Sequence, residues 1–330
     1  RLNGVEVPRP KKPIFLVIVD SEDRTGLLND AVNALLEQDC AVHTVHVSTT
    51  PAGRAIDIFY ITDNRDDLPS ERRANTITGF LRAELGGSMN TVCTITEIPT
   101  FACKCGATFR IPLNGCDCKN VRPNDMTAQK PALWPPPGEE QAIQNSVSKQ
   151  RATVTVDNST SKAHTLLQIQ ARDRKGLLYD CYRAVKDVNI QVSYGKINVQ
   201  GGICELDLFV QDGQGQRVRD PAVEAEMCRR LKLAIDLPVL LSIKGSDCTT
   251  ELRVASTHDA GGRGRPRVLL DVTRALRKLG ILCFQGYVKE DPNTGIQTQS
   301  FLLTSCSDGT PICKDEYEKI YNEVRRYLLS

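Results

Sequence analysis

Hydrophobic positions along the chain alternate between a strand-like and a helix-like period. Residues 14–19 form a short apolar run typical of a buried strand, and the apolar positions of 27–36 then recur every three or four residues, which predicts an amphipathic helix. Two strand-like stretches follow around a Pro-Ala-Gly turn, and a second helix and a last strand complete the segment. The predicted elements are strand 14–19, helix 27–36, strand 42–48, strand 55–61, helix 70–85 and strand 91–97.

The same order of periods returns in the second half of the chain. Asp220 and Pro221 have the character of a helix N-cap followed by proline at the first helical position. A third, more degenerate series follows, in which no closing strand comes after the last helix. The second series is predicted as strand 164–170, helix 177–188, strands 190–199 and 203–211, helix 221–234 and strand 239–243. The third is strand 251–255, helix 268–279, strands 281–289 and 298–303, and helix 314–329.

The order β-α-β-β-α-β predicts a split βαβ, ferredoxin-like unit, in which both helices cover one face of a four-stranded antiparallel sheet. The fold class is therefore α+β, with tandem ferredoxin-like domains. Such small units have thin cores and usually pair with another copy through their sheets, so a homodimer is one expectation. The predicted division is an N-terminal tail 1–12, domain 13–98, a Cys- and Pro-rich linker 99–150, domain 151–245, and domain 246–330 with its last strand missing.

One octet occurs twice, as DRTGLLND at Asp23–Asp30 and as DRKGLLYD at Asp173–Asp180. Each copy lies between the first strand and the first helix of its segment. A β-α-β-β-α-β unit whose first turn reads D-R-x-G-L-L resembles the ACT domain, a small-molecule-binding regulatory module. The stretches Val154–Asp180 and Gly262–Ile281 resemble the plant ACT-repeat family, whose members consist of tandem ACT domains without a catalytic domain.

This resemblance implies amino-acid sensing, as in the ACT pair that reports glutamine in bacterial uridylyltransferases. Members of the family typically have four units, and this chain accounts for three, so an N-terminal unit would precede Arg1 if the chain is a fragment. In ACT domains the ligand usually lies between two units. The second half of a site would then come from strand-two or neighbouring-unit residues that the sequence does not assign.

The chemistry of the octet also follows from its residues. A helix N-terminus exposes unpaired N–H groups and the positive end of the helix dipole, so it suits a carboxylate, and a glycine lets a ligand approach the backbone. Asp23 and Asp173 either cap the helix or meet an α-ammonium group. The alternative is that aspartate and glycine only form a tight turn. Candidate residues for binding a free amino acid are Asp23, Thr25, Gly26, Leu27, Leu28, Asp173, Lys175, Gly176, Leu177 and Leu178.

The neighbouring charges of the octets, Arg24, Asp30, Arg174 and Asp180, are expected to be solvated or to pair on the helix surface. The third domain departs from the octet. It has Gly264-Arg265-Pro266-Arg267 at the equivalent turn, which removes the aspartate and one N–H donor, so no amino-acid site is expected there. Arg263–Pro266 matches the core of an AT-hook, whose arginines lie in a DNA minor groove; the alternatives are an ordinary loop or an anion-binding one.

The linker contains two C-x-C pairs and a proline-rich run at 131–138. Four thiolates would suit a structural zinc ion, although the spacing differs from that of common zinc ribbons; redox-active or free thiols are the alternative. The four candidate ligands are Cys103, Cys105, Cys116 and Cys118. No other cofactor is expected. The remaining cysteines mostly occur singly within predicted strands and helices, where a reduced buried thiol is usual.

Composition narrows the function further. The chain of 330 residues has a net charge of +2, and no apolar run approaches the length of a membrane span, so neither nucleic acid nor a membrane is an expected partner. No phosphate-binding loop, zinc-protease or nucleophile-elbow motif occurs, which favours a non-enzyme. The chain starts at Arg1 without a signal peptide, as in a fragment or processed product; a cytoplasmic or nuclear location is expected. The predicted function is an amino-acid-binding regulatory protein; the alternatives are a ligand-free interaction scaffold, or a zinc- or DNA-binding regulator.

Overall fold

The computed structural model describes residues 13–86, 90–98, 101–102, 108–109, 152–245, 249–257, 265, 267–291, 296–305, 310 and 312–330. The chain divides into two compact units. Unit 1 consists of residues 1–126 and Cys283–Tyr287, and unit 2 of residues 127–282 and 288–330. The predicted linker residues lie mostly outside the described ranges; within them the short strands β5 (Phe101–Ala102) and β6 (Thr108–Phe109) pair with each other.

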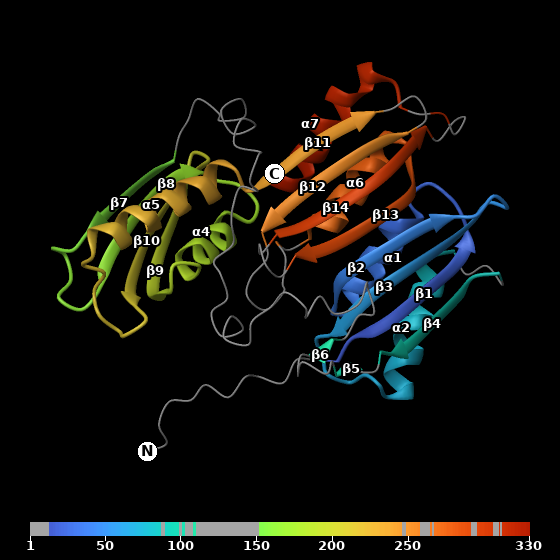
Figure 1. Ribbon diagram of the computed structural model, residues 1–330, viewed down its shortest axis with the longest axis horizontal. Coiled ribbons are helices and arrows are strands. Elements are labelled where there is room, and N and C mark those ends of the chain that lie inside the picture. Colours follow the sequence, from blue (N-terminus) through green and yellow to red (C-terminus); the bar gives the residue numbers. More distant parts are fainter. Residues whose placement is uncertain are drawn as a thin grey trace. The chain divides into compact units, whose positions relative to one another are not determined.

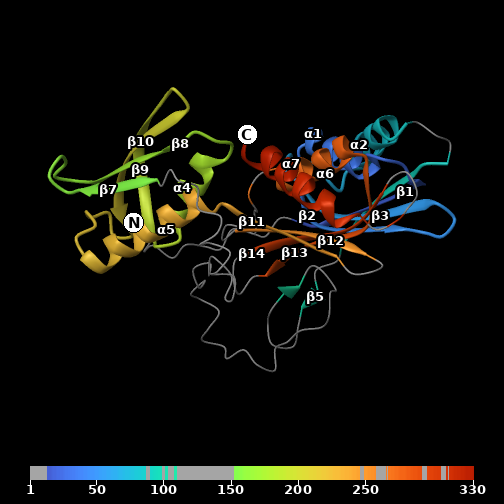
Figure 2. The same ribbon diagram turned by 90° about the horizontal axis from the view of Figure 1, so that it is seen from above.

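Unit 1 has the predicted β-α-β-β-α-β order. In the sheet, β3 lies between β1 and β2, and β4 pairs with the other edge of β1, all antiparallel. Residues Gln285–Tyr287 pair with the outer edge of β2. Figure 2 shows both helices on the same face of the sheet. The elements are β1 (Phe15–Glu22), α1 (Leu27–Glu37), β2 (Cys40–Thr49), β3 (Arg54–Asp63), α2 (Glu71–Glu84) and β4 (Val92–Glu97).

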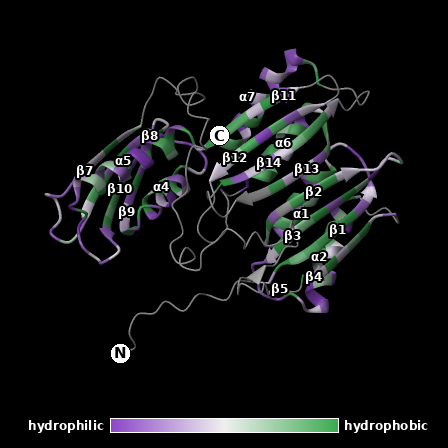
Figure 3. Cartoon of the chain, viewed as in Figure 1, coloured by the Kyte–Doolittle hydropathy of each residue, from purple (hydrophilic) through white to green (hydrophobic). Residues whose placement is uncertain are grey.

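Alternating side chains explain why these segments form a half-covered sheet. Every second residue of β1 is buried, and β3 follows the same alternation, because successive side chains of a strand point to opposite faces. The buried face carries the core residues Val17, Val19 and Phe59, which lie under the helices. Figure 3 shows the same contrast as hydrophobic and hydrophilic residues alternating along the strands. The side chain of Ser70 caps α2 by accepting a hydrogen bond from the Arg73 amide.

The second domain, in unit 2, has the sheet order β7-β8-β10-β9, again antiparallel. Its helices α4 and α5 contact each other (Figure 1). Asp220 caps α5 and Pro221 is its first residue, as predicted. The elements are β7 (Thr153–Asp157), β8 (Thr165–Arg172), α4 (Leu177–Lys186), β9 (Ile190–Gln200), β10 (Ile203–Asp212) and α5 (Pro221–Asp236).

The fourth strand of this sheet is not the one predicted. Residues 239–243 were expected to close the second domain, but they belong to β11, which pairs with β12 of the third domain. The place beside β8 is taken by β7, which immediately precedes it. A strand that precedes the first strand and one that follows the second helix can fill the same antiparallel edge position, and the hydrophobic pattern does not distinguish them.

The third domain is therefore not missing a strand, contrary to the prediction. β11 pairs with β12 along its whole length, and β12 also pairs with β14, both antiparallel. A short connection between β11 and β12 favours this local pairing. The second and third domains thus share the order β-β-α-β-β-α. The elements of the third are β11 (Val239–Gly245), β12 (Thr250–Thr257), α6 (Val268–Leu279), β13 (Ile281–Asp291), β14 (Ile296–Ser305), a 3-10 turn (Lys314–Glu316) and α7 (Tyr317–Leu329).

Candidate functional site

The first octet forms the turn between β1 and α1. Gly26 is the residue before the helix, with φ of 84°, and no side chain caps α1, so Asp23 does not serve as a cap. Asp23 instead accepts a hydrogen bond of 2.7 Å from the Thr49 hydroxyl at the end of β2, and its amide donates to the Gly53 carbonyl at 2.9 Å. Its carboxylate is thereby held against the β2–β3 hairpin. Leu27 and Leu28 are buried core residues of α1 rather than exposed contact residues.

A second carboxyl group lies under this turn. Asp57 of β3 is 1% exposed, and its Oδ1 has no hydrogen-bond partner among the described residues. It pairs with Val47 and Val19 in register, whereas Ala55, two residues earlier, pairs with Thr49 and Ser21. Residues two apart in a strand share a face, so Asp57 lies on the helix-covered face one row below Thr49.

The pKa of Asp57 is raised to about 7, mainly by burial and also by the nearby Asp23 carboxylate, because a second negative charge there is unfavourable. Cys283, which belongs to unit 1, is influenced by the same pair. Burial raises the pKa of its thiol, and the charges of Asp57 and Asp23 act in the same direction. Asp23, Asp57 and Cys283, from three segments of unit 1, therefore influence one another electrostatically.

The second octet turn is occupied by a side chain of the third domain. Gly176 precedes α4 with φ of 78°, and again no side chain caps the helix. The guanidinium of Arg265 donates through Nη2 to the Lys175 carbonyl and through Nη1 to the Leu328 carbonyl at 2.9 Å. A Cβ on Gly176 would lie 2.5 Å from Nη2. The Arg265 guanidinium thus fills the space beside Gly176, so the second turn has no room for a free amino acid in this conformation.

Buried ion pairs surround the second turn. Arg174 Nη1 is 2.6 Å from Asp180 Oδ2, and Arg265 Nε is 3.4 Å from Asp180 Oδ1. Lys175 pairs with Asp271 of α6. Desolvation raises the pKa of Asp180, although both arginines oppose that shift. Arg174 and Asp180 were expected at the helix surface, but Asp180 is 3% exposed because the third domain covers it.

The first turn keeps the surface pair that was expected. Arg24 Nη2 lies 2.8 Å from Asp30 Oδ2, and the Arg24 side chain is 39% exposed. In the second turn, Leu177 is buried as predicted, but Leu178, which was also predicted in the buried stripe of this helix, is 42% exposed. The Asp173 amide donates to the Gly202 carbonyl at 2.8 Å, as the Asp23 amide does to Gly53. The two octets therefore share a backbone and differ in what faces them.

The third turn contributes Arg265 to the second domain instead of forming a site of its own. Arg267 precedes α6 with φ of 65°. Arg265 is 4% exposed, so it is not accessible to a DNA groove in this structure. The other AT-hook residues, Arg263, Gly264 and Pro266, lie outside the described residues. The observed role of Arg265 is an intramolecular contact.

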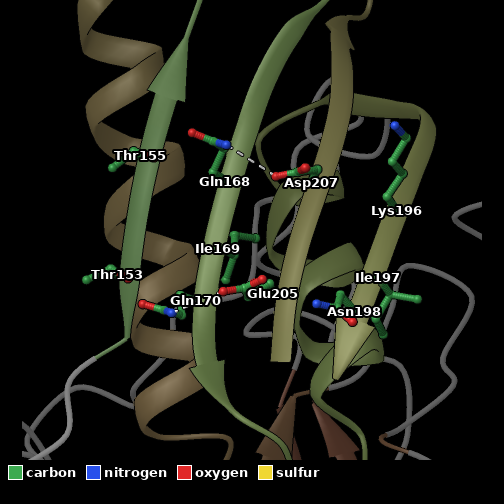
Figure 4. A pocket seen from close by; sticks show the side chains of 10 residues that line it. All are labelled: Thr153, Thr155, Gln168, Ile169, Gln170, Lys196, Ile197, Asn198, Glu205 and Asp207. Atoms are coloured by element: carbon green, nitrogen blue, oxygen red, sulfur yellow. Dashed lines mark hydrogen bonds between the residues drawn. The ribbon is translucent and has the colours of Figure 1, made fainter. Parts of the chain in front are cut away.

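A groove of about 540 Å³ lies over the helix-free face of the second sheet. Figure 4 shows its side chains on β7 to β10, with a dashed line joining Gln168 to Asp207. The amide of Gln168 lies 3.4 Å from Asp207 and that of Gln170 3.3 Å from Glu205. This groove is a polar sheet surface whose carboxylates are hydrogen-bonded to glutamine amides, and it contains none of the predicted site residues.

Metal ligands and membrane spans are not found among the described residues. They contain no group of three or more His, Cys, Asp or Glu placed to hold a metal ion, and no helix long and apolar enough to cross a membrane. The predicted zinc ligands Cys103, Cys105, Cys116 and Cys118 lie outside the described residues. The described cysteines are free; burial raises the pKa of Cys40 and Cys181 to about 12, which keeps both protonated.

Sequence reasoning missed Asp57, Thr49 and the contact made by Arg265. Asp57 did have a signal: it is a charged residue at an inward position of an otherwise apolar strand, AIDIFYI. Thr49 and Arg265 had none, because their partners are remote in sequence and only the folded chain brings them together.

Comparisons with known proteins identify two ACT-type domains in this chain, and the first of the two matched ranges includes β11. Residues 153–247 match the family model described as "ACR9-like, ACT-like domain", and residues 250–330 match "ACT domain-containing protein ACR9, C-terminal". The Arabidopsis thaliana ACT domain-containing protein ACR10 is 30% identical over 331 residues, 99% of this chain and 75% of that protein. The chain belongs to the plant ACT-repeat (ACR) family.

Two further relatives show how much of each protein is shared. ACR9 from Arabidopsis thaliana is 35% identical over 278 residues, which is 83% of this chain and 63% of that protein. The bifunctional uridylyltransferase/uridylyl-removing enzyme of Rhodospirillum rubrum is 25% identical over 70% of this chain and only 21% of the enzyme. The chain therefore spans part of the length of its plant relatives, and it is an ACT-domain protein of a regulatory family.

Proposed function

We propose that this protein is a non-catalytic sensor that binds a free amino acid at the first octet turn. The observation that carries the proposal is the contrast between the two turns: the second is filled by Arg265, whereas no described cation pairs with Asp23 at the first. The amides at the start of α1 suit the ligand's carboxylate. Asp23, held by Thr49, suits its α-ammonium group.

Binding is tested on the full chain by thermal unfolding against a panel of free amino acids, because a ligand that binds only the folded state raises its stability. Asp23→Asn keeps an acceptor for Thr49 but removes the charge, and it should abolish the shift. Asp173→Asn is the matched control at the second turn and should leave the shift unchanged. Melting curves that no amino acid moves would contradict the proposal.

An interaction scaffold is the second candidate, and one surface favours it. Tyr194, Ile197 and Val199 of β9 are 50%, 57% and 49% exposed along the edge of the second sheet. The equivalent strand of unit 1, β2, has that edge covered by Gln285–Tyr287. A second copy of the chain, pairing β9 with β9, would cover this edge in the same way. Sedimentation equilibrium tests it: Ile197→Lys should convert a dimer to a monomer, and a monomeric parent would contradict it.

A further inference from the structure

We infer that the first octet turn takes an amino acid whose side chain carries a second cationic group, and that Asp57 receives that group. The inference rests on the proposed function and specifies its ligand as a dibasic amino acid. It begins from Asp57 itself. A buried carboxyl group is normally hydrogen-bonded, yet Asp57 is 1% exposed and its Oδ1 has no partner among the described residues.

Four arginines of unit 1 are engaged elsewhere. Each forms an ion pair, of at most 2.9 Å, with a carboxylate other than Asp23 or Asp57. The pairs are Arg24–Asp30, Arg54–Asp20, Arg65–Asp39 and Arg73–Asp63. Asp23 and Asp57 therefore bring two carboxyl groups to one turn without a described protein counter-ion.

The charges of a ligand decide between amino-acid classes. A neutral amino acid presents one carboxylate to the amides of α1 and one ammonium group to Asp23, which leaves Asp57 uncompensated. A dibasic amino acid supplies the missing cation, and a paired buried charge is far less unfavourable than an unpaired one. The protein offers two carboxylates, Asp23 and Asp57, and one helix end that binds a carboxylate. A dibasic amino acid offers two cationic groups and one carboxylate, so the charges match.

The spacing fits such a ligand. Thr49, which holds Asp23, and Asp57 face the same side of the sheet in successive rows of the register, where Ala55 pairs with Thr49 and Asp57 with Val47. Two residues along a strand span about 7 Å. The extended side chain of lysine or arginine separates its two cationic groups by a comparable distance. The α-ammonium group at Asp23 would therefore place the side-chain cation in the row of Asp57.

Matched ligands test the inference on the full chain by isothermal titration calorimetry. Norleucine is lysine without its side-chain amine, and citrulline is a neutral isostere of arginine. We expect lysine or arginine to bind at least tenfold more tightly than its neutral analogue. Asp57→Asn should remove that preference while leaving the affinity for the neutral analogue unchanged, and Asp173→Asn should change neither. The ligand comparison in the unmodified protein needs no variant to fold.

Other outcomes separate this inference from the proposed function. If neutral amino acids bind as tightly as dibasic ones, and Asp57→Asn has no effect, Asp57 is structural and the amino-acid site stands without the dibasic specificity. If no amino acid binds, both fail. Titration with MgCl2 or CaCl2 alone gives the third arm: metal binding that depends on Asp57 would show that the two carboxylates serve an ion, and it would overturn the inference.

Discussion

Gly176 of the second domain and the guanidinium of Arg265 lie so close that a Cβ on the glycine would be 2.5 Å from Nη2. The glycine of the second octet is thus required by a domain contact and not only by its backbone conformation. The same contact places the Arg265 guanidinium against the second octet turn, whereas no described cation pairs with Asp23 at the first. Two nearly identical sequences consequently have different surroundings.

Gly176→Ala should destabilise unit 2 by more than the strain of a left-handed residue alone. That strain is about 1 kcal/mol. The added methyl group must also displace Arg265 from its carbonyl partners, which adds a further ~1–3 kcal/mol. Urea unfolding followed by far-UV circular dichroism measures the difference.

Gly215→Ala is the matched control, because Gly215 has φ of 76° in the same domain and nothing lies within 4 Å of its Cβ position. Equal losses for the two variants would show that the contact with Arg265 is not sustained in solution.

Arg265→Met should destabilise the second and third domains by about 3 kcal/mol, since it removes one partner of a buried ion pair and leaves the Lys175 and Leu328 carbonyls without their donor. Arg326→Met is the control. Arg326 pairs with Glu323 on the surface of α7, with a side chain 49% exposed, and its loss should change the unfolding free energy far less than the loss of Arg265. Chemical unfolding of both variants provides the comparison.

The stability of unit 1 should fall as the pH rises from about 4 to about 7, because of Asp57. The folded state raises the pKa of Asp57 to about 7, so in this window it binds more protons than the unfolded state, and raising the pH favours unfolding. Asp57→Asn should remove this dependence and increase stability at pH 8, by up to about 4 kcal/mol. Unfolding midpoints at pH 5 and pH 8 measure the effect; a parent and variant with parallel pH profiles would contradict it.

Asp63 gives the opposite pH dependence of stability, and it does so at lower pH. Desolvation acts against it, but hydrogen bonds from Arg73 and from the Leu68 and Arg65 amides hold the pKa of this buried carboxyl below its usual value of 3.8. Its stabilisation is therefore complete above that value and is lost as the pH falls below it. Asp63→Asn should weaken unit 1 at pH 6 and flatten the acid limb of the unfolding profile between pH 4 and pH 2. An unchanged acid limb would show that the Arg73 pair is not its source.

Much of the fold could be predicted because strands and helices leave local periodic patterns. The stripe of α1, the Ser70-capped α2 and the Asp220-Pro221 start of α5 follow from such patterns. The partner of β11 could not be predicted in the same way. Its apolar residues suit an edge beside either β8 or β12, and the pairing depends on β7 occupying the first of these positions.

In the candidate site too, local features could be predicted from the sequence and long-range contacts could not. The octets correctly marked two helix N-termini that follow a positive-φ glycine. Capping was one of the two roles expected of Asp23 and Asp173, and neither side chain caps its helix; that of Asp23 is bound by Thr49 instead. The two turns looked equivalent in sequence, and Asp180 looked like a surface residue. Arg265 changes both conclusions by burying Asp180 and occupying the second turn.

The sequence by itself determined the repeated ACT architecture, the positions of the turns and the membership of the plant ACT-repeat family, because periodicity, caps and glycine conformations are local properties. Only the tertiary structure decided which strands share a sheet, which turn is filled by Arg265, and that Asp57 lies buried near Asp23. These depend on contacts between residues far apart in the chain. Burial and electrostatic coupling arise from such contacts, and no local pattern encodes them.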